Sequence, residues 1–294
     1  MLVTQKRGGM KVFYDERQSV NSNDSFSPSA EKPAKVLDSW RKLDIPFDVI
    51  SFDPLTVDEI ALAHDWNYVN RVMALKGDNG FGNRSPMVAK ALPWVSGSMV
   101  AAALHSYHTG ELSFSPTSGA HHACYSHGGA FCTFNFLVIA AIKARQAGAA
   151  KIGILDLDFH YGNGTANIIR HLEIDYVVHY SFGKDIIELR GNDKEWFARL
   201  PDIVNMFRGV DLLIYNAGVD SHIDDPLGGV FTTRQMAKRD LLVFKAAKQL
   251  DLKVCASLAG GYQKDENGNI IKVLALHDAT FKAGWMAYER TPKG

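Results

Sequence analysis

Short apolar runs rich in Val, Ile and Leu recur along the chain and are separated by segments with helical periodicity. Runs of roughly four to eight such residues are typical of buried strands, and apolar positions three or four apart are typical of amphipathic helices. This pattern predicts strands at 11–14, 47–51, 111–114, 151–158, 176–180, 211–216 and 253–258. It predicts helices at 57–75, 98–108, 130–146, 166–171 and 233–250.

The predicted strands show little alternation of polar and apolar residues, which indicates burial on both faces. Such strands are typical of a parallel sheet covered by helices. We therefore predict the α/β class, with one domain of three layers (α/β/α) around a mainly parallel central sheet. Thr56 with Glu59, and Thr232 with Gln235, match the capping box that marks helix starts. The polar, turn-rich residues 18–33 predict a surface loop.

Composition narrows the classes of function. The 294 residues contain 32 Lys+Arg and 32 Asp+Glu, so the chain lacks the basic field that nonspecific nucleic-acid binding needs. Three cysteines without CxxC spacing are typical of free thiols rather than of a disulfide framework or a zinc–thiolate site. No uninterrupted apolar run approaches about 18 residues, so we expect a cytoplasmic protein that binds neither membranes nor nucleic acid directly.

Acidic and histidine side chains stand where a predicted strand ends. Residues 154–164 read ILDLDFHYGNG, which places Asp156, Asp158 and His160 on alternate positions and hence on one side of the strand. Asp220 follows the strand predicted at 211–216. Ligands of α/β sheets bind at the carboxyl ends of strands, so we expect these side chains to meet.

Two aspartates and one histidine match a catalytic metal site with an open position. We predict Asp158, His160 and Asp220 as ligands, and leave Asp156 for orientation or for a monovalent cation, because three carboxylates would over-neutralise one zinc. Each motif also has an ordinary structural interpretation: Asp-x-Asp as a loop anchor, His121-His122 as a core pair, and Gly-Gly-Tyr as a turn. Their joint placement at strand ends and adjoining loops favours a site.

Five segments together resemble the histone deacetylase and acetylpolyamine amidohydrolase superfamily. They are GAHHA (119–123), GGAFC (128–132), DLDFHYGNGT (156–165), NAGVDSHIDDPLGG (216–229) and LAGGY (258–262). Asn163 and the DPLGG segment resemble the class II-like bacterial branch. The resemblance implies the arginase-deacetylase fold, with a deacetylase-like catalytic domain over 10–294 after a flexible N-terminal extension over 1–9.

The resemblance implies the same three metal ligands and adds catalytic roles. His122 would be the general base that takes a proton from the attacking water, and His121 an electrostatic partner near the scissile carbonyl. Asp156 would orient His121. Asn163 would face His122, and its uncharged amide suits a base that must be neutral near pH 7.

The resemblance also implies the substrate site and the cofactors. Tyr262 would donate its phenol to the substrate carbonyl, Phe131 would form one channel wall, and Gly129 and Gly261 would permit close backbone approach. The expected cofactor is Zn²⁺, with Fe²⁺ as an alternative and K⁺ near Asp156. The implied reaction is hydrolysis of an N-acylated amine such as acetyl-lysine or an acetylpolyamine, with no acyl-enzyme.

The chain departs from the family pattern at several places. Tyr161 replaces the usual second histidine, and Ser181 comes slightly late for a potassium ligand. The loop that begins at residue 183 also differs: Ile186 or Ile187 would line the channel there, and Glu188 would face either a cationic substrate or solvent. An arginase-like dimanganese hydrolase and a non-catalytic acyl-lysine-binding module stay open as alternatives. The loops at 18–33 and 183–196 could shape the entrance or a homo-oligomer contact.

Overall fold

The computed structural model describes residues 9–21, 25–186 and 193–288. The predicted extension over 1–9, apart from Gly9, lies outside these ranges, and so do Ile187 and Glu188.

Seven parallel strands form one sheet in the order β2-β1-β3-β7-β6-β4-β5. They are β1 (Met10–Phe13), β2 (Phe47–Ile50), β3 (Ser113–Ser115), β4 (Ile152–Asp156), β5 (Val177–Ser181), β6 (Leu212–Gly218) and β7 (Val254–Ala259). Each predicted strand is present, with shifted ends. The central strands β4, β6 and β7 are buried along their whole length, which explains why their sequences show no polar alternation.

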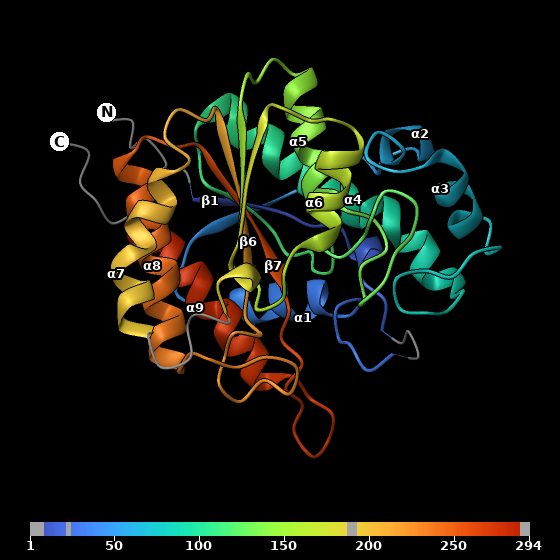
Figure 1. Cartoon of the computed structure of the whole chain (residues 1–294). Coiled ribbons are helices and arrows are strands. Elements are labelled where there is room, and N and C mark those ends of the chain that lie inside the picture. Colours follow the sequence, from blue (N-terminus) through green and yellow to red (C-terminus); the bar gives the residue numbers. More distant parts are fainter. Residues whose placement is uncertain (1–8, 22–24, 187–192, 289–294) are drawn as a thin grey trace, which may run out of the picture.

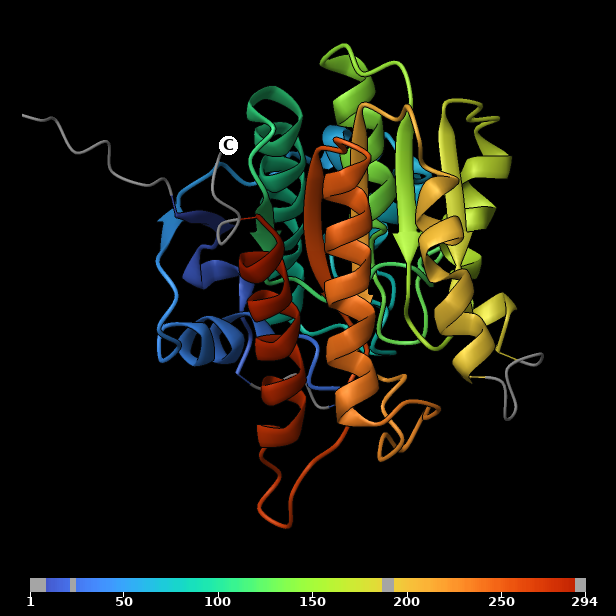
Figure 2. The same cartoon turned by 90° about the vertical axis from the view of Figure 1, so that its left-hand side faces the viewer.

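Helices cover both faces of the sheet, which confirms the predicted three-layer fold (Figure 1). In the described ranges they are α1 (Lys32–Trp40), α2 (Val57–Ile60), α3 (Trp66–Met73), α4 (Pro86–Thr109), α5 (Phe136–Gln146), α6 (Asn163–His171), α7 (Asp193–Asn205), α8 (Thr233–Gln249) and α9 (Ile271–Tyr288). One apolar core joins α1, α7, α8 and α9 to the sheet, and a second joins α2 to α6 to its other face. Figure 2 shows α7, α8 and α9 standing side by side in front of the strands.

Both predicted capping boxes are present, at Thr56 and at Thr232. The single helix predicted at 57–75 is wrong, because the chain breaks between α2 and α3. There His64 Nδ1 donates to the carbonyl of Cys124 at 2.9 Å, and Asp65 caps α3 by accepting from the amide of Tyr68 at 2.8 Å. Contacts with a distant loop therefore override the helical periodicity.

The helix predicted at 130–146 begins later, at Phe136, because Asn135 caps it by accepting from the amide of Val138. The helix predicted at 98–108 begins earlier, at Pro86, after the cap Ser85. This helix, α4, is long and apolar enough to span a membrane by length and composition, but 61% of its most apolar window is buried inside the molecule. Packing against α5 and the sheet accounts for its apolar character.

Among the α-helices of the described residues, α1, α7 and α9 were not predicted. The surface loop predicted at 18–33 is wrong in part, because Gln18, Ser27, Ser29 and Lys32 are buried and Lys32 already begins α1. The polar sequence of this segment did not predict this burial; Ser27 and Ser29 are buried with a hydrogen bond between their hydroxyl groups.

Candidate active site

The predicted ligands and the Gly-Gly-Tyr motif follow three adjacent strands. β4 ends at Asp156, β6 at Gly218 and β7 at Ala259, and β6 lies between the other two. Because these strands are parallel, their carboxyl ends meet at one edge of the sheet. The fold thus brings together side chains that are far apart in the sequence.

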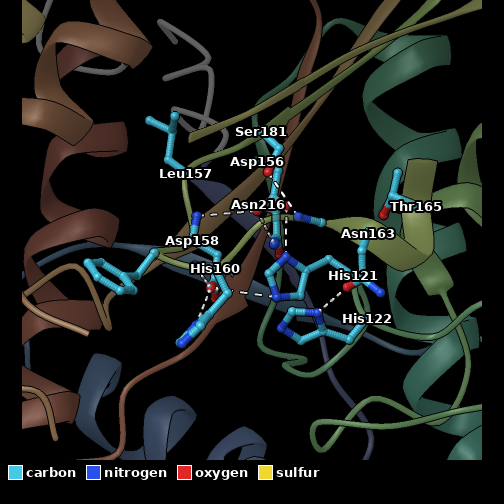
Figure 3. A network of polar contacts seen from close by, with 12 residues as sticks. His121, His122, Asp156, Leu157, Asp158, His160, Asn163, Thr165, Ser181 and Asn216 are labelled. Carbon is cyan, nitrogen blue, oxygen red and sulfur yellow. Dashed lines mark hydrogen bonds and ion pairs between the residues drawn. The ribbon is translucent and has the colours of Figure 1, made fainter. Parts of the chain in front are cut away.

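Asp158, His160 and Asp220 form a cluster of potential metal ligands, with one atom of each within 4.8 Å of the others. His160 Nδ1 lies 3.3 Å from Asp158 Oδ1 and 2.9 Å from Asp220 Oδ2. Backbone amides orient both carboxylates: Phe159 N donates to Asp220 at 2.9 Å and His160 N to Asp158 at 2.9 Å. Figure 3 shows Asp158 and His160 turned toward each other.

The charges of this cluster fit a cation. Asp158 and Asp220 are 2% and 0% exposed. Burial, together with the nearby charge of Asp158, raises the pKa of Asp220 to about 7. Hydrogen bonds to both carboxylates raise the pKa of His160 to about 10. Two buried carboxylates beside one imidazole are costly without further positive charge, so this donor set suits a divalent metal ion.

His121 lies beside the cluster and is paired with a carboxylate. Its Nδ1 donates to Asp156 Oδ2 at 2.8 Å, and its Nε2 lies 3.5 Å from Asp158 Oδ1. Burial alone would lower the pKa of His121, but the charges of Asp156 and Asp158 outweigh it and raise the pKa to about 9. His121 is therefore a charged imidazolium near pH 7 in the metal-free protein.

His122 packs against His121, with ring centroids 4.0 Å apart, but faces an amide. Its Nδ1 donates to Asn163 Oδ1 at 2.5 Å, which leaves Nε2 free to accept a proton (Figure 3). Burial and the charge of His121 lower the pKa of His122 to about 4. The ring is therefore neutral near pH 7, which is the state that a general base requires.

Asp156 occupies the centre of a buried network at the end of β4. Its carboxylate accepts from Asn216 Nδ2 at 2.7 Å and from the amide of Asp158 at 3.2 Å, in addition to His121. Ser181 is paired with Asp156 in the β4–β5 register, and its Oγ accepts from an amide at 2.9 Å. Ser181 therefore stands level with Asp156 at the end of β5, and whether it is a potassium ligand stays a prediction.

Tyr262 lies beside the cluster after β7 and is 8% exposed. Its amide donates to Asp225 Oδ2 at 2.8 Å, and its ring lies 5.5 Å from that of Phe131. Burial raises the pKa of Tyr262 above its ordinary value, and the charges of Asp158 and Asp220 act in the same direction. The phenol therefore keeps its proton and can act as a donor.

Phe131 forms an apolar wall between Tyr262 and Phe81. It and Ala130 have φ values of +67° and +45°, a backbone conformation that non-glycine residues rarely adopt and that tends to persist at functional sites. A Cβ at Gly129 would meet nothing within 4 Å, whereas one at Gly261 would come within 2.7 Å of a neighbouring side chain. Gly261 thus serves close packing inside the protein, while Gly129 leaves open space beside the wall.

The structure brings the predicted ligands, both histidines, Asp156, Asn163 and Tyr262 together at this edge of the sheet, with Phe131 beside Tyr262. It also adds residues that the sequence interpretation missed. Asn216 and Asp225 belong to the segment NAGVDSHIDDPLGG, which also contains the predicted ligand Asp220. The polar residues of this segment could therefore have been proposed as members of the site. Lys32 and Arg239 gave no such signal. The roles of the site residues stay predictions.

Comparisons with known proteins show the family of the chain and a similar fold. Residues 29–184, more than half of the chain, match the histone deacetylase domain model. A probable deacetylase from Methanothermobacter thermautotrophicus is 26% identical over 296 residues, covering 88% of this chain and 87% of that protein. Acetylpolyamine amidohydrolase 2 from Pseudomonas aeruginosa is 28% identical over 182 residues, covering 52% of each. The HDA15 HD domain has a similar fold, with a TM-score of 0.74 at 21% identity, covering 96% of this chain and 90% of that structure.

Proposed function

The chain belongs to the histone deacetylase family and is a hydrolytic deacetylase, and from this premise we propose that it removes acetyl or related acyl groups from N-acylated amines with the help of a zinc ion. The observation that carries the proposal is the buried Asp158–His160–Asp220 cluster beside a neutral His122 and a protonated Tyr262.

Asp158, His160 and Asp220 would hold the metal. Two carboxylates and one imidazole suit Zn²⁺, and Fe²⁺ is the alternative that this donor set also accepts. When bound, such an ion supplies Lewis acidity, which polarises an amide carbonyl and makes water more acidic.

The side chains around the cluster would supply the proton transfer and the charge stabilisation that the reaction needs. His122 Nε2 takes the proton of the attacking water, because Nδ1 already carries a proton, which it donates to Asn163 Oδ1. The Tyr262 phenol donates to the carbonyl oxygen as negative charge develops there. His121, held charged by Asp156, keeps positive charge beside the reacting centre. None of these roles requires a serine or cysteine nucleophile.

The substrate would enter past apolar rings. Phe131 lies next to Tyr262, and the half-exposed Phe26 stacks on Tyr262 with ring centroids 6.1 Å apart. Aromatic walls suit the methylene chain of an acylated alkylamine, a feature that acetyl-lysine and acetylpolyamines share. Both are candidate substrates.

Release of acetate tests the proposal. Zinc-loaded protein is incubated with acetylputrescine, acetylspermidine and acetyl-lysine peptides, and we expect turnover of at least one of them. Tyr262→Phe should lower kcat about 10²- to 10³-fold, while Tyr176→Phe, a matched change before β5 at the opposite edge of the sheet, should not. No turnover of any substrate at full zinc occupancy would contradict the proposal. Two manganese ions per chain by elemental analysis would favour an arginase-like hydrolase.

We also propose that potassium binds near Asp156, where Ser181 stands in register. Activity should then be higher in potassium chloride than in tetramethylammonium chloride at equal ionic strength. Equal activity in the two salts would exclude a potassium requirement.

A further inference from the structure

Two fully buried cations lie behind the candidate site. Lys32 is the first residue of α1 and Arg239 lies in the first half of α8, and both are 0% exposed. Burying a charge is costly unless the group is paired and hydrogen-bonded. Lys32 Nζ and Arg239 Nη1 donate to backbone carbonyls just beyond or at the ends of strands, so each connects its helix to the end of a strand.

Arg239 connects the ends of β4 and β6. Its Nη1 donates to the carbonyl of Leu157 at 3.1 Å and to that of Gly218 at 2.7 Å. Leu157 directly precedes Asp158, and Gly218 stands two residues before Asp220. A single nitrogen thus ties together the two backbone segments that carry the carboxylate ligands.

The paired register of β4 and β6 ends at Asp156 and Asn216, and the last backbone hydrogen bond between the two strands runs from Leu157 N to the carbonyl of Asn216 at 3.1 Å. Arg239 extends this connection to the carbonyls of Leu157 and Gly218. Arg239 is in turn fixed by Asp240, which accepts from its Nε at 2.7 Å. Asp240 also accepts from the Tyr215 hydroxyl at 2.5 Å and from Thr280 Oγ1 at 2.6 Å. The guanidinium is therefore anchored to β6, α8 and α9.

Lys32 supports the end of β7 in a similar way. Its Nζ donates to the carbonyl of Gly260, the first residue after the strand. Gly260 has φ of +52°, and a Cβ there would come within 2.3 Å of Asp220 Cγ, so the loop passes directly against the ligand carboxylate. Tyr262 follows two residues later, so the direction of the Gly260 carbonyl bears on where the phenol lies.

We propose that Arg239 and Lys32 are positioning residues with separate tasks: Arg239 sets the spacing of Asp158 and Asp220 for cation binding, and Lys32 sets the position of the Tyr262 phenol. The Lys32 task rests on the proposed function, whereas the Arg239 task requires only that the cluster binds a metal ion. The two substitutions should therefore have different effects.

Metal binding tests Arg239. Chelator-treated full chain is titrated with Zn²⁺, and both the Kd and the rise in Tm on binding are measured. Arg239→Lys keeps a cation beside Asp240, so it should fold, but we expect zinc to bind at least about 10-fold more weakly and the rise in Tm to shrink. Lys245→Met, an exposed change on the same helix, is the control and should match the unaltered protein.

A purely structural role would lower the Tm of the metal-free and metal-loaded forms alike. An Arg239→Lys protein that binds zinc within twofold of the unaltered Kd would overturn the assignment. Arg239→Met removes the cation altogether and should weaken zinc binding further. If this variant does not fold, the zinc Kd of Arg239→Lys still tests the assignment.

A double-mutant cycle tests Lys32. Lys32→Met should lower kcat about 10- to 100-fold in the unaltered protein and no more than twofold in the Tyr262→Phe background, with the zinc Kd unchanged. Lys35→Met, a partly exposed change in the same helix, is the control. Equal losses in both backgrounds would overturn the assignment.

Failure of the proposed function gives a different result, because then the unaltered protein turns over no acylated amine. In that case the positioning role of Lys32 is tested by the rate of amide hydrogen exchange over residues 258–264. Faster exchange in Lys32→Met but not in Lys35→Met supports the positioning of this loop, and unchanged exchange overturns it.

Discussion

His121 and His122 are neighbours in the sequence and in space, yet their surroundings keep one imidazole charged and the other neutral near pH 7. His121 donates to the Asp156 carboxylate, and its pKa is raised to about 9. His122 donates to the Asn163 amide, and its pKa is lowered to about 4. Burial acts to lower the pKa of both rings, so the difference comes from the carboxylates beside His121 and from the charge of His121 beside His122. The pair teaches that carboxylates beside one ring, and an amide beside the other, divide two neighbouring imidazoles into a cation and a neutral ring.

The largest effect is expected from removing the base. His122→Gln should lower kcat about 10²- to 10⁴-fold, since no other side chain then takes the proton of water. His121→Gln should have a smaller effect, because it removes charge but leaves the base. Acetate release at equal zinc occupancy, checked by elemental analysis, measures both. A His122→Gln protein that is as active as His121→Gln would contradict the division of roles.

The positions of the site residues could be predicted because of the topology. The carboxyl ends of parallel strands share one edge, so Asp158, His160 and Asp220 had to meet once β4 and β6 were recognised as neighbouring strands. The placement of the ligands needs only local sequence and a general rule of α/β sheets. That Asn163 faces His122, and hence that His122 is neutral, was an implication of the family resemblance.

Other features depend on contacts that no local pattern encodes. Lys32 bonds to Gly260 across 228 positions, and in sequence it is one more charged residue in a polar segment. Arg239 contacts Leu157, 82 positions away. Similarly, the break between α2 and α3 depends on the loop at Cys124 rather than on the periodicity of 57–75. Long-range hydrogen bonds of buried polar groups were the part that sequence interpretation could not reach.

Removing the carboxylate should make the two histidines alike. Asp156→Asn keeps an acceptor for His121 Nδ1 but loses a charge that opposes the effect of burial, so the pKa of His121 should fall from about 9 by about 1–3 units. We expect kcat to fall about 10- to 100-fold, as when orienting partners are removed at metal sites. Titration of the histidine ring protons by NMR measures the pKa directly. An unchanged pKa would mean that Asp158, and not Asp156, holds the charge on His121.

The reciprocal change, Asn163→Asp, should make His122 resemble His121. A carboxylate at 163 favours the imidazolium, so the pKa of His122 should rise from about 4 by about 1–3 units. The base acts only when neutral, and activity is lost as the pH falls through its pKa. The acidic limb of the kcat/KM profile should therefore move to higher pH, while activity near pH 8 changes little. Asn167→Asp, the same substitution one turn along α6, is the control and should leave the limb in place. If both variants retain the original limb, His122 is not the group whose protonation sets it.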